Sequence, residues 1–139
     1  MKEINIKEIV ESLIETFLSA GDVSLDLRDK GLIKRIKSDN TPVSNGDLEV
    51  NKIITQKISK LTPKIPIVSE ETSENKTIKN LENFWLIDPI DGTYDYINNL
   101  DEFTINAGLI INKKPEAGLI YAPAKNRMFF SYGMDLAFE

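Results

Sequence analysis

The chain has 139 residues and a formal net charge of −5 at neutral pH, a length sufficient for one domain with a buried core. It contains neither cysteine nor histidine, which excludes disulfide frameworks, thiolate nucleophiles, Ser-His-Asp hydrolysis and the usual zinc sites. The acidic balance argues against binding to nucleic-acid polymers or anionic membranes, and no apolar run has the length of a membrane span. Because the N-terminus also lacks a signal-peptide pattern, we expect a soluble cytoplasmic protein.

A long amphipathic helix is predicted near the N-terminus. Apolar residues recur at helical spacing from Ile6 to Leu18, with Asn5 placed as the N-terminal cap. After Gly21, apolar and polar residues alternate as in a strand, so spacing alone leaves the end of this helix open.

A second helix is predicted after a polar loop over residues 37–47. Ser44 and Asp47 form a capping pair for an apolar series that runs from Val50 to Leu61. Ile33 and Ile36 fall in a connecting segment rich in Lys and Arg, for which we expect a surface position.

The central stretch of the chain is residues 84–93, Phe-Trp-Leu-Ile-Asp-Pro-Ile-Asp-Gly-Thr. Its apolar start predicts a short buried strand ending at Ile87, and the turn that follows carries Asp88 and Asp91. Two neighbouring carboxylates repel each other unless a proton or a cation lies between them, and Mg²⁺ prefers such oxygen ligands. Free N–H groups after Gly92 would add an anion site, which suits a phosphate ester. Asp-Pro and Asp-Gly are also common turn dipeptides, so this stretch alone leaves a purely structural role open.

A second set of acids follows an apolar strand at residues 65–69. If the two strands are neighbours, their carboxyl ends bring Glu70, Asp88 and Asp91 to one place. For Glu71 and Glu74 we expect a solvated acidic loop, because runs of charge usually lie on the surface.

The remainder predicts a short helix over residues 94–99 after Thr93, then strands over 103–111, 117–122 and 127–132. Residues 112–115 are expected to form a hairpin between the first two strands. This order predicts a single α+β domain over 1–139, with two long helices packed on a mostly antiparallel sheet.

Ser-Glu-Glu at 69–71 and Trp-Leu-Ile-Asp-Pro-Ile-Asp-Gly-Thr at 85–93 resemble the metal motifs of the inositol monophosphatase superfamily of Mg²⁺-dependent, Li⁺-sensitive phosphatases. Residues 102–106 and 118–124 are most similar to its CysQ-type 3'(2'),5'-bisphosphate nucleotidases, which act in sulfur metabolism. The resemblance implies the N-terminal half of the sugar-phosphatase fold, with the first helix continuing to about Lys30 and ending at Gly31.

The resemblance also implies roles for individual residues. Mg²⁺ would be held by Glu70, Asp88, Asp91 and the carbonyl of Ile90. Thr93 and Asp47 would orient the attacking water, although a helix-capping acid at Asp47 looks the same in sequence. N–H groups near Gly92 and Thr93 would hold the phosphate of a small phosphorylated substrate. The implied reaction converts adenosine 3',5'-bisphosphate to AMP and phosphate.

Three alternatives stay open. The chain is also compatible with an inositol-monophosphatase-like sugar phosphatase. Aspartyl-phosphate phosphatases have a superficially similar motif, but the two residues between Asp88 and Asp91 misplace the nucleophile and the acid. The resembled enzymes are roughly twice as long and supply a further metal-binding Asp from their second half. A truncated, non-catalytic metal- or partner-binding domain is therefore the third reading, with weak hydrolysis and self-association through an uncovered sheet edge or apolar face.

Overall fold

The computed structural model of the chain describes residues 5–71, 81–133 and 137–139. Helix α1 spans Ile6–Lys30, where the Asn5 side chain accepts the N–H of Glu8, and Gly31 with φ of 98° ends it. Helix α2 spans Asn45–Leu61 and begins with the predicted capping box between Ser44 and Asp47. The longer version of the first helix and the start of the second are thus confirmed.

The main sheet has six strands in the order β3-β4-β5-β6-β7-β8. Their bounds are β3 Ile67–Ser69, β4 Phe84–Asp91, β5 Thr104–Ile111, β6 Lys114–Ala122, β7 Arg127–Ser131 and β8 Ala137–Phe138. Strand β3 runs parallel to β4, and every other neighbouring pair is antiparallel. The predicted α+β class with a mostly antiparallel sheet is confirmed.

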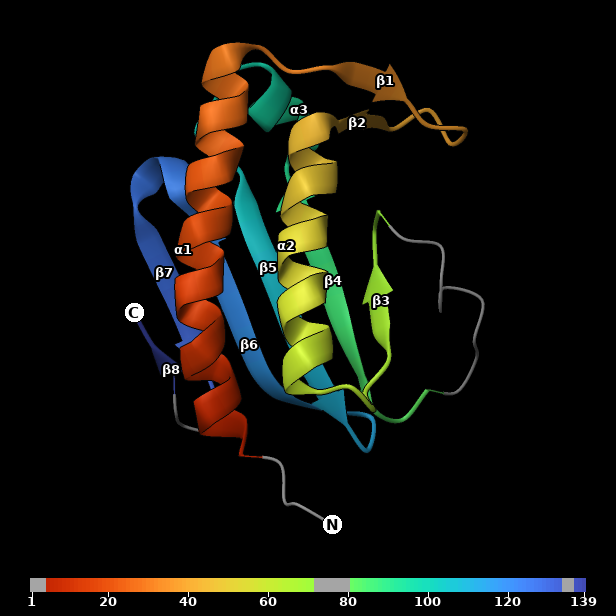
Figure 1. Ribbon diagram of the computed structural model, residues 1–139, viewed down its shortest axis with the longest axis vertical. Coiled ribbons are helices and arrows are strands. Elements are labelled where there is room, and N and C mark those ends of the chain that lie inside the picture. The colour runs from red at the N-terminus through yellow and green to blue at the C-terminus, as the bar shows by residue number, and fades with distance from the viewer. Residues whose placement is uncertain (1–4, 72–80, 134–136) are drawn as a thin grey trace.

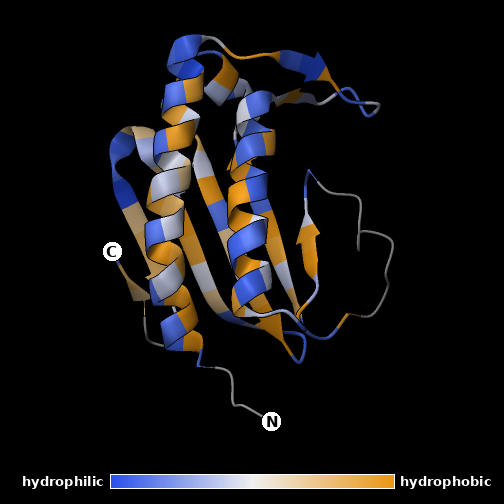
Figure 2. Cartoon of the chain, in the orientation of Figure 1, coloured by the Kyte–Doolittle hydropathy of each residue, from blue (hydrophilic) through white to orange (hydrophobic). Residues whose placement is uncertain are grey.

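Both long helices lie side by side on one face of this sheet (Figure 1). Hydrophilic residues mark much of the outward side of α2, whereas the strands behind the helices are largely hydrophobic (Figure 2). The buried core between the two layers is contributed by α1, α2 and the sheet, and its largest members include Leu13, Phe17, Ile54, Ile58, Trp85, Ile87, Ile105, Leu109 and Leu119. Within the described residues, neither long helix is apolar enough to cross a membrane.

One buried hydrogen bond fixes β4 beneath α2. The indole N–H of Trp85 donates to the hydroxyl of Thr62, 3.0 Å away, just after the end of α2. An indole N–H left without a partner in the core would cost free energy, so this bond helps set where β4 begins its path to the acids.

The prediction of a loop over residues 37–47 is wrong in part. Strand β1 at Lys34–Ile36 pairs with β2 at Pro42–Ser44 in a separate two-stranded hairpin. Composition favoured a loop, but Val43 is buried, and burying it organises the hairpin. Ile33 and Ile36 are exposed, as expected.

The central strand is longer than predicted, because β4 continues through both acids to Asp91. Its pairing with β5 shifts register between Asp88 and Asp91. Proline lacks an N–H and is tolerated at such irregularities, so Pro89 lies in the strand without breaking it. The two acids therefore lie on a bulged strand end and not on a separate turn.

Smaller differences concern the ends of elements. The helix after Gly92, α3, covers Thr93–Ile97 and is shorter than predicted. The hairpin between β5 and β6 turns on Asn112 and Lys113 alone, both with positive φ, and β6 begins at once. Two-residue turns of this kind match the twist of antiparallel strands. The sequence of residues 75–83 indicates a polar connection before β4, and most of this segment lies outside the described residues.

Candidate active site

The parallel strands β3 and β4 bring two of the predicted metal-binding acids to the same edge of the sheet. Ser69 is level with Ile87 in the register, and the N–H of Glu70 donates to the carbonyl of Ile87 at 3.1 Å. Glu70 therefore comes directly after β3, beside the part of β4 that carries Asp88, and the prediction that these two strands are neighbours is confirmed.

Asp88 is half-buried, and its surroundings disfavour its charged form. Burial is the main cause that raises the pKa of Asp88 to about 6, and the nearby carboxylates of Asp91, Glu70, Glu71 and Asp47 add to the effect. Because four other acids contribute to the raised pKa of Asp88, a cation bound beside it would reduce the repulsion between these carboxylates. The electrostatics of this edge of the sheet thus favour a cation.

The acids do not enclose a ready-made site. Among the described residues, no three acidic side chains lie close enough together to hold a metal ion. Asp88 lines a cavity of about 550 Å³, whereas Asp91 lines a separate hollow of about 220 Å³ beside Gly92 and Glu102.

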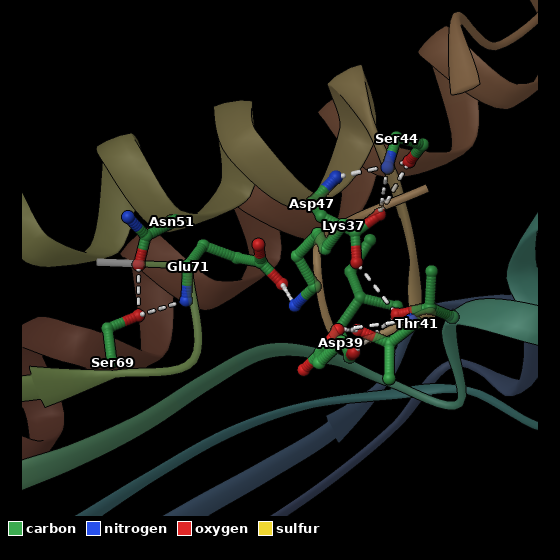
Figure 3. A network of polar contacts seen from close by, with 10 residues as sticks. Lys37, Asp39, Thr41, Ser44, Asp47, Asn51, Ser69 and Glu71 are labelled. Atoms are coloured by element: carbon green, nitrogen blue, oxygen red, sulfur yellow. Dashed lines mark hydrogen bonds and ion pairs between the residues drawn. The ribbon is translucent and has the colours of Figure 1, made fainter. Parts of the chain in front are cut away.

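Asp47 is fully buried and accepts three hydrogen bonds from neighbouring side chains and backbone. Its Oδ2 accepts the N–H of Ser44 at 2.9 Å and the Ser44 hydroxyl at 2.6 Å (Figure 3). Its Oδ1 accepts the hydroxyl of Thr93 at 2.8 Å. Capping α2 and contacting Thr93 are therefore compatible, because each role uses a different carboxylate oxygen.

Thr93 connects Asp47 to the strand that carries the acids. Its hydroxyl also lies 3.1 Å from the carbonyl of Ile90, a longer distance than that to Asp47. Gly92 precedes it with φ of 88°, and a Cβ there would lie 2.8 Å from the carbonyl of Glu102. Only glycine allows this tight path from Asp91 to Thr93 without a shift of the backbone.

The prediction that Glu71 lies on the surface is wrong. Its side chain is only 7% exposed and forms an ion pair with Lys37, whose Nζ lies 3.5 Å from Oε1 (Figure 3). Burial raises the pKa of Glu71, while the charge of Lys37 opposes that rise. Lys37 lies in the turn of the β1–β2 hairpin, so this hairpin reaches over to the acids. Glu74 lies outside the described residues.

Other polar residues lie near the acids, and the sequence did not predict a role for them in the site. The hydroxyl of Ser69 donates to Asn51 Oδ1 and accepts the N–H of Glu71 at 3.4 Å, which ties the end of β3 to α2 (Figure 3). Asn106 lies opposite Asp88 in the pairing of β4 with β5. Its place in the stretch 102–106 was visible in sequence, but its partner across the sheet was not.

Comparison with known proteins places these features in a family context. The family model described as "Inositol monophosphatase family" matches residues 5–136. The 3'(2'),5'-bisphosphate nucleotidase CysQ of Buchnera aphidicola is 38% identical over 120 residues, which cover 84% of this chain and 45% of that protein. The CysQ protein of Aggregatibacter actinomycetemcomitans is 34% identical over 128 residues, with 88% of this chain and 46% of that protein covered.

Solved structures agree on the architecture. The extragenic suppressor protein suhB of Bartonella henselae superposes with a TM-score of 0.83 at 25% identity, covering 94% of this chain and 51% of that one. A staphylococcal inositol monophosphatase gives a TM-score of 0.86 at 18% identity, covering 99% of this chain and 52% of that one. The chain thus spans about half the length of the relatives that it matches.

Proposed function

Because the chain belongs to the inositol monophosphatase family, we propose that it provides the metal- and phosphate-binding half of a Mg²⁺-dependent phosphomonoesterase. The finer proposal is a 3'(2'),5'-bisphosphate nucleotidase that converts adenosine 3',5'-bisphosphate to AMP and phosphate. It is supported by the similarity to CysQ proteins over more than four fifths of the chain.

The donor set suits Mg²⁺. Glu70, Asp88 and Asp91 offer carboxylate oxygens and Ile90 a carbonyl oxygen, the hard ligands that this ion takes. The raised pKa of Asp88 supports a cation in this place, because the acids that disfavour its charge would be neutralised together. When bound, Mg²⁺ lowers the pKa of water and offsets charge on a phosphoryl group.

The hydrogen bond from Thr93 to Asp47 is the observation that carries the catalytic proposal. Because the Thr93 hydroxyl gives its proton to a buried carboxylate, its oxygen lone pairs remain free to accept a hydrogen bond from water. A water held there is oriented with its own lone pair directed away from Thr93. Asp47 is thus a positioning residue that acts through Thr93, and the chain offers no cysteine or histidine as an alternative nucleophile or base.

The phosphate of the substrate is assigned to the backbone around Gly92 and Thr93. The close approach of Gly92 to the carbonyl of Glu102 leaves no room for a side chain at this position, so the fold itself requires glycine there. The assignment itself rests on the family resemblance of residues 85–93.

A second candidate is a metal- or partner-binding domain without turnover. Among the described residues no three acids lie close enough together to hold an ion, which favours the partner-binding form of this candidate over turnover. A sugar phosphatase of the inositol monophosphatase type remains the competing substrate class.

Phosphate release with Mg²⁺ from adenosine 3',5'-bisphosphate, inositol 1-phosphate and fructose 1,6-bisphosphate, measured side by side on this chain, separates these proposals. Preferential release from the nucleotide supports the nucleotidase, and preference for inositol phosphate contradicts it. Mg²⁺-dependent thermal stabilisation without release from any substrate favours the binding domain. If Mg²⁺ produces neither thermal stabilisation nor phosphate release, the proposed metal site itself is contradicted.

A further inference from the structure

A lysine lies at the hollow of about 220 Å³ beside Gly92, hereafter the Asp91 hollow. Among the described residues that line it, Lys125 carries the only positive charge, and the other charged residues are Asp91, Asp101 and Glu102. The ammonium group of Lys125 lies 2.6 Å from Oε1 of Glu102. One cation therefore borders the hollow in which the proposed phosphate-binding backbone lies.

The backbone that carries Lys125 is fixed, whereas the tip of its side chain is free to move. Lys125 ends the one-turn 3-10 helix η1, Pro123–Lys125, which follows β6 and packs against α1. Pro123 is buried, and Asn126 closes the turn with φ of 53°, a conformation that asparagine tolerates. The Lys125 side chain is 43% exposed. Because lysine has a flexible stem, its ammonium group can leave Glu102 without a shift of the backbone.

The ion pair between Lys125 and Glu102 is easily exchanged for a stronger one. The Glu102 side chain is 70% exposed, and ion pairs between exposed side chains contribute little to stability. A phosphomonoester carries a charge of about −1.5 to −2 at neutral pH and three acceptor oxygens, which is more than a carboxylate offers. A phosphate group that enters the hollow should therefore displace Glu102 from Lys125.

Lys125 and the proposed site of the cleaved phosphate lie on opposite sides of the hollow. Gly92 follows the end of β4, Lys125 follows the end of β6, and β5 lies between these two strands. Neighbouring strands are about 4.8 Å apart, so the backbones of β4 and β6 are separated by roughly 10 Å. A cation at this distance suits a second phosphate on the substrate better than the phosphate at Gly92.

We propose that Lys125 binds the second phosphate of a bisphosphate substrate, across the Asp91 hollow from the phosphate that is cleaved. This inference rests on the proposed function and deepens it, because it gives a structural reason to prefer a nucleotide bisphosphate over an inositol monophosphate. The second phosphate replaces Glu102 as the partner of Lys125. In adenosine 3',5'-bisphosphate, it is the phosphate that stays on the product AMP.

Glu102 makes this site selective. An unpaired lysine would attract any small anion. Because Lys125 is paired with Glu102, a ligand has to offer more negative charge than a carboxylate before it displaces this partner. Removal of the Glu102 carboxylate should therefore strengthen binding of the second phosphate, whereas removal of the Lys125 ammonium group should weaken it.

The test measures the binding of two probes to this chain in the presence of Mg²⁺, by NMR titration. AMP keeps only the second phosphate and is the product of the proposed reaction, whereas inorganic phosphate stands for the group that is cleaved. Lys125→Met removes the charge and keeps an unbranched side chain. We expect it to lower the affinity for AMP roughly tenfold, as for the loss of one charge-assisted hydrogen bond, and the affinity for inorganic phosphate less than about twofold.

Three further variants make the result specific. Glu102→Gln should raise the affinity for AMP roughly threefold, because the competing carboxylate is gone. Lys125→Arg keeps the positive charge and should stay within about threefold of the parent. Lys60→Met removes an exposed lysine from the last turn of α2 and is the matched control, which should change neither affinity.

Each other outcome overturns the proposal in a recognisable way. Equal losses for AMP and inorganic phosphate in Lys125→Met would show that Lys125 does not distinguish a second phosphate. An equal loss of AMP affinity in Lys60→Met would show that only the overall charge of the chain matters. If inorganic phosphate binds with Mg²⁺ but AMP does not, this inference fails while the proposed function stands. If neither probe binds, the proposed function fails together with it.

Discussion

The hydroxyl of Tyr96 donates a hydrogen bond to the backbone carbonyl of Ser24, 2.6 Å away. The ring is fully buried, packs against Phe103 at 4.9 Å between centroids, and lies so close to Gly46 that a Cβ there would be 2.1 Å from its oxygen. These contacts hold the short helix α3 against both long helices. Because α3 begins at Thr93, the position of the candidate catalytic hydroxyl depends on them.

We expect Tyr96→Phe to lower the free energy of unfolding by about 1–2 kcal/mol, because one buried hydrogen bond is lost while the ring packing is kept. Burial raises the pKa of Tyr96 above its ordinary value. Above about pH 10 the unfolded state loses this proton while the folded state keeps it, so stability must decline with rising pH. Urea unfolding between about pH 8 and pH 11 measures both the loss of unfolding free energy and its decline with pH.

The variant should show a shallower alkaline decline than the parent. Tyr121 retains its own raised pKa in both proteins, so part of the decline will remain. A decline of unchanged steepness in Tyr96→Phe would show that the pKa of Tyr96 does not differ between the folded and unfolded states.

Thr93→Val removes the hydroxyl that donates to Asp47 and keeps the shape of the side chain. Leaving a buried carboxylate oxygen without this donor should cost about 1–3 kcal/mol of unfolding free energy. Thr93→Ser keeps the hydroxyl and should cost less than half as much. Any phosphate release should be abolished in the valine variant and partly kept in the serine variant, and equal stability losses in both would contradict the role of the hydrogen bond.

Asp91→Asn tests the metal proposal. Asp91 is exposed and is one of the like charges that raise the pKa of Asp88. Its neutralisation should leave the Mg²⁺-free melting temperature unchanged or slightly higher, and should remove most of the gain on adding Mg²⁺. Glu11→Gln, at an exposed position in the first half of α1, is the control and should keep the gain. If Asp91→Asn gains as much from Mg²⁺ as the parent, Asp91 is not a ligand.

Much of this arrangement follows from local sequence signals. The start of α2 was predictable because Ser44 and Asp47 are three residues apart, and their reciprocal hydrogen bonds depend on that spacing alone. The convergence of Glu70 and Asp88 was predictable because each follows a short apolar strand. The first prediction needed only a local motif, whereas the second also needed the two strands to be neighbours, which the structure confirms.

Features that depend on long-range pairing could not be predicted in the same way. Glu71 looked like part of a solvated run of charge, and only the fold of the β1–β2 hairpin brings Lys37 to it. Strand β4 was expected to end at Ile87, but pairing with β5 carries it on to Asp91. Both errors have one cause, since a tertiary partner overrode a local preference.

Lys37→Met should destabilise the chain by about 1–3 kcal/mol without Mg²⁺, because the nearly buried carboxylate of Glu71 loses its counter-ion. Glu71→Gln in the same chain should remove most of this penalty. A double-mutant cycle from urea unfolding measures the coupling. Excess Mg²⁺ should reduce the cost of Lys37→Met if it supplies positive charge to the same acids, and additive single effects would show that the ion pair contributes nothing.

Gly92→Ala and Gly31→Ala form a matched pair that isolates the close approach beside the acids. Both glycines have positive φ, 88° and 98°, so alanine is strained at either position, at a cost of about 1–2 kcal/mol. A Cβ at Gly31 meets no atom within 4 Å, whereas one at Gly92 lies 2.8 Å from the carbonyl of Glu102 and must displace backbone. Gly92→Ala should therefore cost more than Gly31→Ala, by about 1–2 kcal/mol of strain. It should also weaken Mg²⁺-dependent stabilisation, because the displaced segment joins Asp91 to Thr93. Equal losses of unfolding free energy in the two variants would mean that the contact with Glu102 relaxes without cost, and that the path of the chain at Gly92 is not what holds these two residues in place.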